Sequence, residues 1–325
     1  MAIEVLKPGL ATTVQDAGRE GYYHLGIPLS GALDQYSFLA ANLLVGNDEN
    51  AAALECTLLG PELAFRRDAI VAVAGADLQP KVNGEPRPGY EAFPVKSGDV
   101  LSFAFLKAGA RAYLAVAGGI DVPMVLGSRS TYGLGAFGGF RGRALQGGDL
   151  LPIGKPGAMA RAGRKLAAEL RQPLPRELDL RVVPGLYYHR LTEQSAHDFF
   201  EDVWSVAPEA DRIGYRYRHG RPLRWKDRKQ PFGAGSDPSN IVDAGYPFGS
   251  IQVPGGLEPI VLHRDAVSGG GYAMIGTVIS ADMDAIAQMQ PNNKARFVAV
   301  DMEQALAARR DYRARTDRLR AALSS

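Results

Sequence analysis

A loop near the N-terminus gathers residues that can bind ligands or move protons. Gln15, Asp16, Arg19 and His24 all fall within residues 12–24. An imidazole titrates near neutral pH, so His24 and the Asp16 carboxylate are candidates for acid–base catalysis. Gln15 could orient an amide, and Arg19 could bind an anion. The structural alternative stays open, because Asp16 and Arg19 are close enough in sequence to form an ion pair that fixes the loop.

Residues 127–143 combine glycine-rich backbone with hydroxyl and guanidinium groups, which suits a carboxylate or phosphate. The candidate anion-binding side chains are Ser128, Arg129, Ser130, Arg141 and Arg143. The alternative is a glycine-rich barrel loop whose arginines pair with carboxylates, and the sequence leaves both open. Residues 133–138 formally fit the dinucleotide fingerprint, but the further glycines that follow prevent a helix from starting and no acid lies at the required distance.

A third candidate segment, residues 268–272, has the sequence Ser-Gly-Gly-Gly-Tyr. Gly270 and Gly271 offer a backbone that tolerates an anion, Tyr272 can handle a proton, and Gln252 can orient an amide. The five histidines are scattered, which predicts no metal site. Cys56 lies in an apolar setting and is expected in the core.

Short strand-like runs dominate the elements that must position these residues. They are residues 3–6, 69–74, 100–105, 111–117, 180–183, 251–253, 260–263, 273–279 and 296–300. Gly, Pro, Asn or Asp flank most of them, a spacing typical of a sandwich or barrel. Apolar spacing predicts three helices, at residues 33–45, at 193–204 with Thr192 as the N-cap, and at 302–323.

Composition excludes several classes of protein. The net charge of +2 gives no bulk electrostatic reason to expect nucleic acid as a partner. The basic stretch 212–229 alternates like a strand followed by a solvated hairpin, so no nucleic-acid partner is expected. No apolar run approaches the length of a membrane span, and the first residues have no leader pattern. Together with the single cysteine, this predicts a cytoplasmic protein without a membrane partner.

A change in composition between residues 155 and 177, with prolines at 173 and 175, predicts a domain boundary. We therefore expect a first β unit at residues 1–157, a linker at 158–178, a second β unit at 179–301 and a C-terminal helix at 302–325.

Motifs in sequence order resemble one known family, that of allophanate hydrolase subunit 2, or subdomains C and D of biotin-dependent carboxyltransferases. The matching segments are residues 5–9, 12–19, Asp34 with 41–47, 53–55, 127–131, 139–143, 148–149, 211–215, 251–254 and 270–272. The resemblance implies a mainly β fold of two cyclophilin-like β-barrel units with a few helices. One departure stands at residues 268–273, where family members usually have Thr-Thr-Gly-Gly-Tyr-Pro.

The resemblance also implies a role beside other proteins in a complex. The expected function is that of one component of a heteromeric ATP-dependent 5-oxoprolinase, which opens 5-oxoproline to glutamate and requires ATP with Mg. One partner would be a homologous first subunit, of the allophanate hydrolase subunit 1 type or of the B type in 5-oxoprolinase. The other would be the A-type subunit of 5-oxoprolinase. A chain without a fused biotin carboxylase or carrier favours this interpretation.

Two alternatives remain. One is a carboxyltransferase subunit for urea or a related amide, with carboxybiotin on a separate carrier. The other is a non-catalytic regulatory subunit that binds its first-subunit homologue. In the leading hypothesis Asp16, His24 and Tyr272 handle protons, the arginines neutralise phosphate or carboxylate charge, and Gln15 and Gln252 orient the amide.

Overall fold

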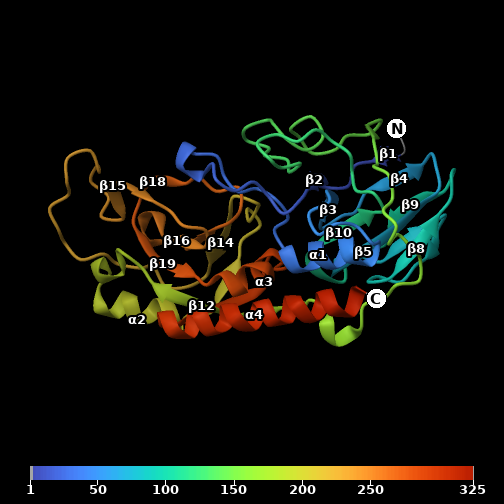
Figure 1. The fold of residues 1–325 in the computed structure, drawn as a ribbon. Coiled ribbons are helices and arrows are strands. Elements are labelled where there is room, and N and C mark those ends of the chain that lie inside the picture. Colours follow the sequence, from blue (N-terminus) through green and yellow to red (C-terminus); the bar gives the residue numbers. More distant parts are fainter. Residues whose placement is uncertain (1–2, 325) are drawn as a thin grey trace. The chain divides into compact units, whose positions relative to one another are not determined.

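The structure, a computed structural model, describes residues 3–324 and is rich in β-strands (Figure 1). Chain contacts divide it into two compact units. The first unit comprises Met1–Glu20, Ser30–Leu174 and Ala314–Ser325, and the second comprises Gly21–Leu29 and Pro175–Arg313.

Two antiparallel sheets form the body of the first unit. The six-stranded sheet has the order β11-β1-β4-β9-β6-β7, and the five-stranded sheet has the order β2-β3-β10-β5-β8. The first sheet contains β1 (Ile3–Lys7), β4 (Glu62–Phe65), β6 (Pro80–Val82), β7 (Glu85–Pro86), β9 (Val100–Phe103) and β11 (Leu150–Leu151). The second contains β2 (Thr13–Gln15), β3 (Ala53–Thr57), β5 (Ala69–Asp77), β8 (Ala92–Val95) and β10 (Ala108–Val116).

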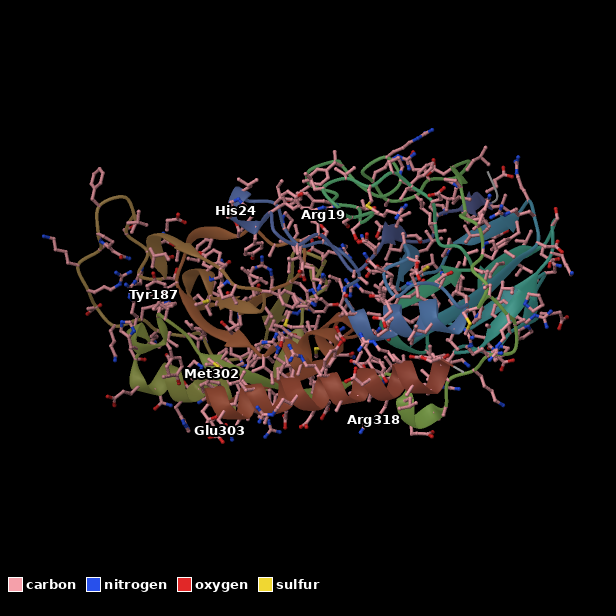
Figure 2. All side chains as sticks on the ribbon, in the orientation of Figure 1. Arg19, His24, Tyr187, Met302, Glu303 and Arg318 are labelled. Carbon is pink, nitrogen blue, oxygen red and sulfur yellow. The ribbon has the colours of Figure 1, made fainter. Side chains whose placement is uncertain are left out.

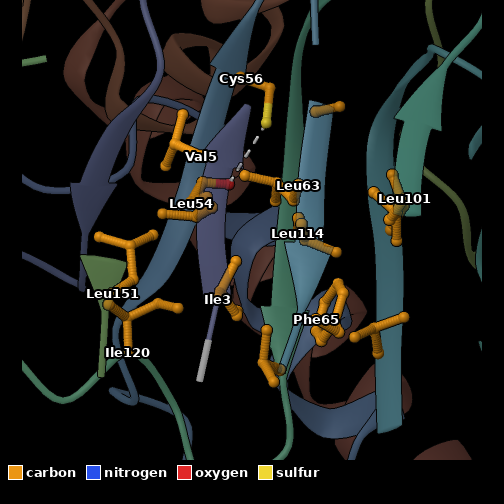
Figure 3. Close-up of a cluster of buried hydrophobic side chains, with 14 of the residues drawn as sticks. Ile3, Val5, Leu54, Cys56, Leu63, Phe65, Leu101, Leu114, Ile120 and Leu151 are labelled. Atoms are coloured by element: carbon orange, nitrogen blue, oxygen red, sulfur yellow. Dashed lines mark hydrogen bonds between the residues drawn. The ribbon is translucent and has the colours of Figure 1, made fainter. Parts of the chain in front are cut away.

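Alternation along the strands supplies the apolar core between these sheets. Ile3 and Leu63 of the first sheet join Leu54 and Leu114 of the second in one buried cluster (Figure 3). Cys56 is also fully buried there, with its Sγ atom 4.0 Å from the Leu54 carbonyl oxygen. Because successive side chains of a strand point to opposite faces, the intervening residues of β5 and β10 are free to build a second core.

That second core lies between the five-stranded sheet and helix α1 (Gln35–Leu44). Tyr36 and Leu39 of α1 pack with Ala72 of β5 and Tyr113 of β10. The Asp34 carboxylate caps the helix by accepting from the Ser37 backbone N–H at 2.9 Å, which satisfies one of the donors that a helix start leaves open. The helix expected at 33–45 is therefore present with slightly shorter bounds.

The second unit is a closed seven-stranded barrel of order β12-β19-β16-β17-β14-β13-β20. Its strands are β12 (Glu177–Pro184), β13 (Trp204–Val206), β14 (Gly214–Arg218), β16 (Ser250–Gln252), β17 (Ile260–Leu262), β19 (Met274–Val278) and β20 (Lys294–Ala299). Only β12 and β20 pair in parallel. A separate hairpin joins β15 (Asn240–Gly245) to β18 (Gly269–Tyr272).

Helix α2 (Glu193–Glu201) covers part of this barrel. Phe199 stacks on Phe297 of β20 with ring centroids 4.6 Å apart, and Thr192 caps the helix start as predicted. The predicted end at residue 204 is wrong, because Trp204 opens strand β13 and donates from its indole to the Phe199 carbonyl oxygen. Trp204 continues the apolar spacing of α2, although the backbone at Trp204 is extended.

The part of the chain that the structure describes contains two further helices, α3 (Met283–Ala287) and α4 (Met302–Leu323). The sequence predicts α4 with these bounds and misses the short α3. Residues 3–324 also contain five short 3-10 segments, η1 (Tyr23–Leu25), η2 (Ala168–Leu170), η3 (Tyr188–Arg190), η4 (Pro254–Gly256) and η5 (Ser280–Asp282). No helix within residues 3–324 has the length and apolar character needed to cross a membrane.

The predicted mainly β fold with a few helices is confirmed. Each strand predicted from composition has a counterpart, and no helix starts within residues 133–148, in agreement with the rejection of the dinucleotide fingerprint. The second unit is a closed barrel, whereas the first consists of two packed sheets.

Candidate functional site

The carboxylate of Asp16 ties two distant loops of the first unit together. Its Oδ1 atom accepts from the hydroxyls of Ser128 at 2.7 Å and Ser130 at 2.5 Å, and from the Gly18 backbone N–H at 2.8 Å. Its Oδ2 atom accepts from the Arg129 backbone N–H at 2.5 Å. Four donors converge on this buried carboxylate, so its geometry is that of a group that fixes the loop 128–130.

Arg19 reinforces the same contact. Its buried guanidinium donates from Nη2 to the Ser130 carbonyl oxygen at 2.6 Å and lies 4.9 Å from the centre of the Phe137 ring. A Cβ atom on Gly138, which has φ of +70°, would lie 2.1 Å from the Ser130 carbonyl oxygen. The glycine at 138 is therefore required where the loop 128–130 passes closest. We call Asp16, Arg19, Ser128 and Ser130 the Asp16 clamp.

Gln15 is buried at the end of β2 beside this clamp. Its Nε2 atom donates to the Thr13 hydroxyl at 2.9 Å and to the Thr131 carbonyl oxygen at 3.3 Å. Its Oε1 atom is shielded from solvent and accepts no hydrogen bond from the described residues. The amide thus holds β2 against residue 131, and one acceptor is unused.

The three predicted arginines of residues 127–143 have different surroundings. Arg129 donates from Nε to the Val122 carbonyl oxygen at 2.8 Å. Arg143 forms a two-pronged pair with Asp149, at 2.7 and 2.8 Å, and this pair lowers the pKa of the Asp149 carboxyl below its usual value. Arg141 is exposed, with its guanidinium 5.2 Å from the Phe140 ring centre.

Arg141 also lines a cavity of about 490 Å³ in the first unit. The other lining residues are Val122, Pro123, Val125, Pro152 and residues 136–140 and 142. Among these described residues Arg141 carries the one charged side chain, and the walls are otherwise apolar or glycine backbone. A mainly apolar pocket with a single cation is suited to a small ligand with one anionic group.

In the second unit, Tyr246 links several of the predicted residues. Its hydroxyl donates to the Tyr272 carbonyl oxygen and accepts from the Tyr272 backbone N–H, both at 2.8 Å. Tyr23 donates to the Tyr246 carbonyl oxygen at 2.7 Å. Burial raises the pKa of Tyr246, and although the Gln252 side chain lies near the phenol and acts to lower its pKa, the phenol is neutral at neutral pH. We call Tyr23, Tyr246, Gln252 and Tyr272 the Tyr246 cluster.

The predicted glycines of β18 border this cluster. A Cβ atom on Gly270 would lie 3.1 Å from the Tyr246 ring, and one on Gly271 would lie 3.4 Å from the Ile241 carbonyl oxygen. Close packing of the tyrosine ring thus explains the glycine at 270. The Tyr272 side chain is partly exposed, and His24 is exposed on η1 of the same unit (Figure 2).

The structure thus arranges the predicted residues in two groups. Asp16, Arg19, Ser128 and Ser130 meet in the first unit, with Gln15, Arg129 and Arg141 nearby. Gln252, Gly270 and Tyr272 meet in the second unit around Tyr246, which the sequence did not indicate. Its sequence signal is weak, because a tyrosine between a glycine and a proline indicates only a turn. Within residues 3–324, no three His, Cys, Asp or Glu side chains gather as metal ligands would.

Comparison with known families gives a match over most of the chain. Residues 25–299 match the family described as carboxyltransferase domain, subdomain A and B. The chain belongs to this family. The predicted family membership is confirmed, although the subdomain letters of the matching family are A and B and not C and D.

The relatives of this carboxyltransferase-family chain are parts of enzymes. The C subunit of 5-oxoprolinase from Escherichia coli is 38% identical over 309 residues, covering 95% of this chain and 94% of that protein. The urea amidolyase of Lachancea kluyveri is 37% identical over 314 residues, covering 93% of this chain but 17% of that protein.

A solved structure extends this likeness to three dimensions. The Kluyveromyces lactis urea carboxylase superposes with a TM-score of 0.90 at 34% sequence identity, covering 98% of this chain and 29% of that chain. The chain therefore spans a minor part of the urea enzymes and nearly the full length of the bacterial 5-oxoprolinase component.

Proposed function

We propose that this chain is one component of a heteromeric, ATP-dependent 5-oxoprolinase that converts 5-oxoproline, ATP and water to glutamate, ADP and phosphate. The observation that carries the proposal is the match to the C subunit of 5-oxoprolinase over 94% of that protein's length. The urea amidolyase match covers 17% of a much longer protein. The proposed partners are a homologous first subunit, of the B type, and the A-type subunit of 5-oxoprolinase. The proposed compartment is the cytoplasm.

The chemistry we propose begins with activation of the lactam. Its carbonyl oxygen attacks the γ-phosphorus of ATP, so that an O–P bond forms and the bond to ADP breaks. Water then adds to the carbonyl carbon, the C–N bond breaks as the ring nitrogen takes up a proton, and an acyl phosphate remains. A second water cleaves the acyl phosphate to the carboxylate of glutamate and free phosphate. Phosphorylation of the oxygen weakens the amide resonance that otherwise makes nitrogen a poor leaving group.

Arg141 is the first-unit residue best placed to act on an anionic ligand, because it is exposed and lines the apolar cavity. In this proposal it neutralises phosphate or carboxylate charge as that charge shifts. Asp16 and Arg19 position residues 128–130, and His24 and Tyr272 are the proposed proton carriers. Mg²⁺ would arrive with the phosphates of ATP, which supply the oxygen ligands it prefers.

The test is to co-express the chain with its two proposed partners and to measure ADP release with and without 5-oxoproline, together with glutamate. We expect ADP and glutamate in equal amounts, only with 5-oxoproline present. Arg141→Gln should lower kcat/KM by about tenfold or more, the effect of losing one charged contact to the ligand. Arg87→Gln, which removes the same charge from an exposed site of the same unit, should leave it unchanged.

A second candidate function is carboxyl transfer from carboxybiotin to urea or a related amide. It is favoured by the superposition on the Kluyveromyces lactis urea carboxylase at a TM-score of 0.90. Activity would then depend on a biotinylated carrier and would be blocked by avidin. If 5-oxoproline yields no ADP and carboxybiotin yields no transfer, both enzymatic proposals fail and the regulatory subunit is left.

A further inference from the structure

Backbone pairing in the second unit brings two arginines into one neighbourhood. Leu191 and Trp225 form an antiparallel bridge next to η3. The bridge is flanked by hydrogen bonds from the Lys226 N–H to the Arg190 carbonyl oxygen at 2.8 Å and from the Thr192 N–H to the Arg224 carbonyl oxygen at 3.0 Å. Arg190 and the chain that leads to Arg228 are therefore held against each other.

Each guanidinium contacts an uncharged group, so its positive charge is not neutralised by that contact. The Arg190 guanidinium carbon lies 4.3 Å from the centre of the Tyr187 ring. Arg228 donates from Nη2 to the Asn240 carbonyl oxygen at 2.7 Å. An aromatic face and a carbonyl dipole orient a guanidinium but carry no net negative charge to offset it.

These contacts also place the pair beside the Tyr246 cluster. Asn240, which anchors Arg228, pairs with Tyr272 across the β15–β18 hairpin. Tyr187, whose ring contacts the Arg190 guanidinium, packs against the apolar cluster that contains Tyr246. The Tyr187 backbone N–H donates to the Met274 carbonyl oxygen at 3.1 Å. The arginines thus border residues that the sequence already marks as candidates for ligand binding.

Several other arginines of the same unit are paired with carboxylates. Arg181 meets Asp282, Arg212 meets Asp265, and Arg221 meets Asp202, each at 2.8 Å or less. Across residues 3–324, by contrast, no carboxylate forms an ion pair or hydrogen bond with Arg190 or Arg228.

Some hydrogen-bond donors of these two guanidinium groups have no acceptor among the described residues. Nη1 of Arg190 and Nε of Arg228 are shielded from solvent, and no acceptor among the described residues receives them. Burial lowers the pKa of Arg228, and the like charge of Arg190 lowers it further. Two close, partly buried cations without a counter-charge are costly, and an anion bound between them would relieve that cost.

We propose that Arg190 and Arg228, with Tyr187 beneath the first, form a binding site for an oxyanion, namely the carboxylate or phosphate group of a small ligand. Guanidinium groups match the planar, two-oxygen face of both groups. Both side chains are only partly buried, so a ligand can reach them. The identity of the ligand rests on the proposed function, in which the candidates are the carboxylate of 5-oxoproline and a phosphate of ATP.

The test measures binding directly by calorimetry, on the full chain and on its complex with the partner subunits. The probes are inorganic phosphate, 5-oxoproline, and 2-pyrrolidinone, which is the same lactam without the carboxylate. Arg190→Gln and Arg228→Gln should each weaken binding of the oxyanion by about tenfold or more, because each removes a charged hydrogen bond. Arg224→Gln, which removes an exposed charge from the same segment, should bind like the original protein.

The pattern of binding identifies the source of the oxyanion. Binding of 5-oxoproline but not of 2-pyrrolidinone, lost in both variants, assigns the site to the substrate carboxylate. Binding of phosphate, lost in both variants, assigns it to a phosphate. Arg190→Lys should restore part of the affinity, since the charge is kept and the planar fork is lost. Circular dichroism of each variant confirms that the barrel is folded.

The proposal is overturned if neither phosphate nor 5-oxoproline binds the chain or the complex at about 10 mM, which corresponds to a binding free energy near 3 kcal/mol. It is also overturned if the two variants and Arg224→Gln bind the probes equally. Both outcomes test the binding site independently of the proposed function, because binding is measured without ADP release. A complex that binds phosphate through these arginines but makes no glutamate would keep the site and remove the 5-oxoprolinase activity.

Discussion

At the scale of single residues, Cys56 behaves as a core side chain. It is fully buried between the sheets of the first unit, and burial raises the pKa of its thiol far above the usual value. Because the thiolate is the reactive form, we expect no reaction with a thiol reagent at pH 8 in the folded protein. Full reaction of one thiol should appear in guanidinium chloride. Rapid labelling of the folded chain would contradict this placement.

The pair of Arg143 and Asp149 predicts a pH dependence of stability. Arg143 lowers the folded-state pKa of Asp149 below the unfolded value of about 3.9. The stabilisation is therefore present above pH 3.9 and is lost as pH falls through the lower, folded-state pKa.

We expect Asp149→Asn to lower the free energy of unfolding by about 1 kcal/mol at pH 7, since the pair is partly exposed. The difference from the original protein should shrink toward pH 2. Urea unfolding at both pH values measures it. An equal difference at both would show that the charge of Asp149 contributes nothing.

At the scale of elements, two glycines of the loop 133–142 give opposite predictions. A Cβ atom on Gly138 would collide with the Ser130 carbonyl oxygen and crowd Arg19, and its φ of +70° is strained for other residues. A Cβ atom on Gly133 would meet nothing within 4 Å.

We expect Gly138→Ala to lower the free energy of unfolding by about 2 kcal/mol or more, because it disrupts the Asp16 clamp as well as straining the backbone. Gly133→Ala should change it by less than about 0.5 kcal/mol. Urea unfolding followed by circular dichroism compares the two. Similar losses in both variants would mean that the loop does not depend on this close approach.

Sequence patterns predicted the positions of strands and helices better than they predicted which residues of distant segments make contact. Strands and α4 were predictable because burial repeats along them with a local period. The contact of Asp16 with Ser130 joins residues 114 positions apart, and no local pattern encodes which loop a carboxylate will reach. Trp204 was misassigned because apolar spacing alone does not show where a helix ends and a strand begins. The role of Tyr246 was missed because its hydrogen bonds also join residues that are far apart in sequence.

At the scale of the whole molecule, each unit carries its own spectroscopic probe. Both tryptophans, Trp204 and Trp225, belong to the second unit, and the single cysteine belongs to the first. Leu319 of α4 is buried in the first unit's helix-facing core.

We expect Leu319→Ala to lower the stability of the first unit by about 2–5 kcal/mol, the usual cost of a cavity. The urea midpoint for labelling of Cys56 should therefore fall further than the midpoint for tryptophan fluorescence. Leu306→Ala, at a position that is 45% exposed on the same helix, should move neither. Equal shifts of both midpoints in Leu319→Ala would show that the units unfold as one.

The path of the chain between its units has a consequence for how such a protein can evolve. The backbone passes from one unit to the other after residues 20, 29, 174 and 313. A single recombination point therefore cannot transfer either unit intact to another gene, because every cut leaves part of one unit on the wrong side. The two units must be duplicated, fused or lost together. This agrees with relatives of very different lengths that each match more than 90% of this chain.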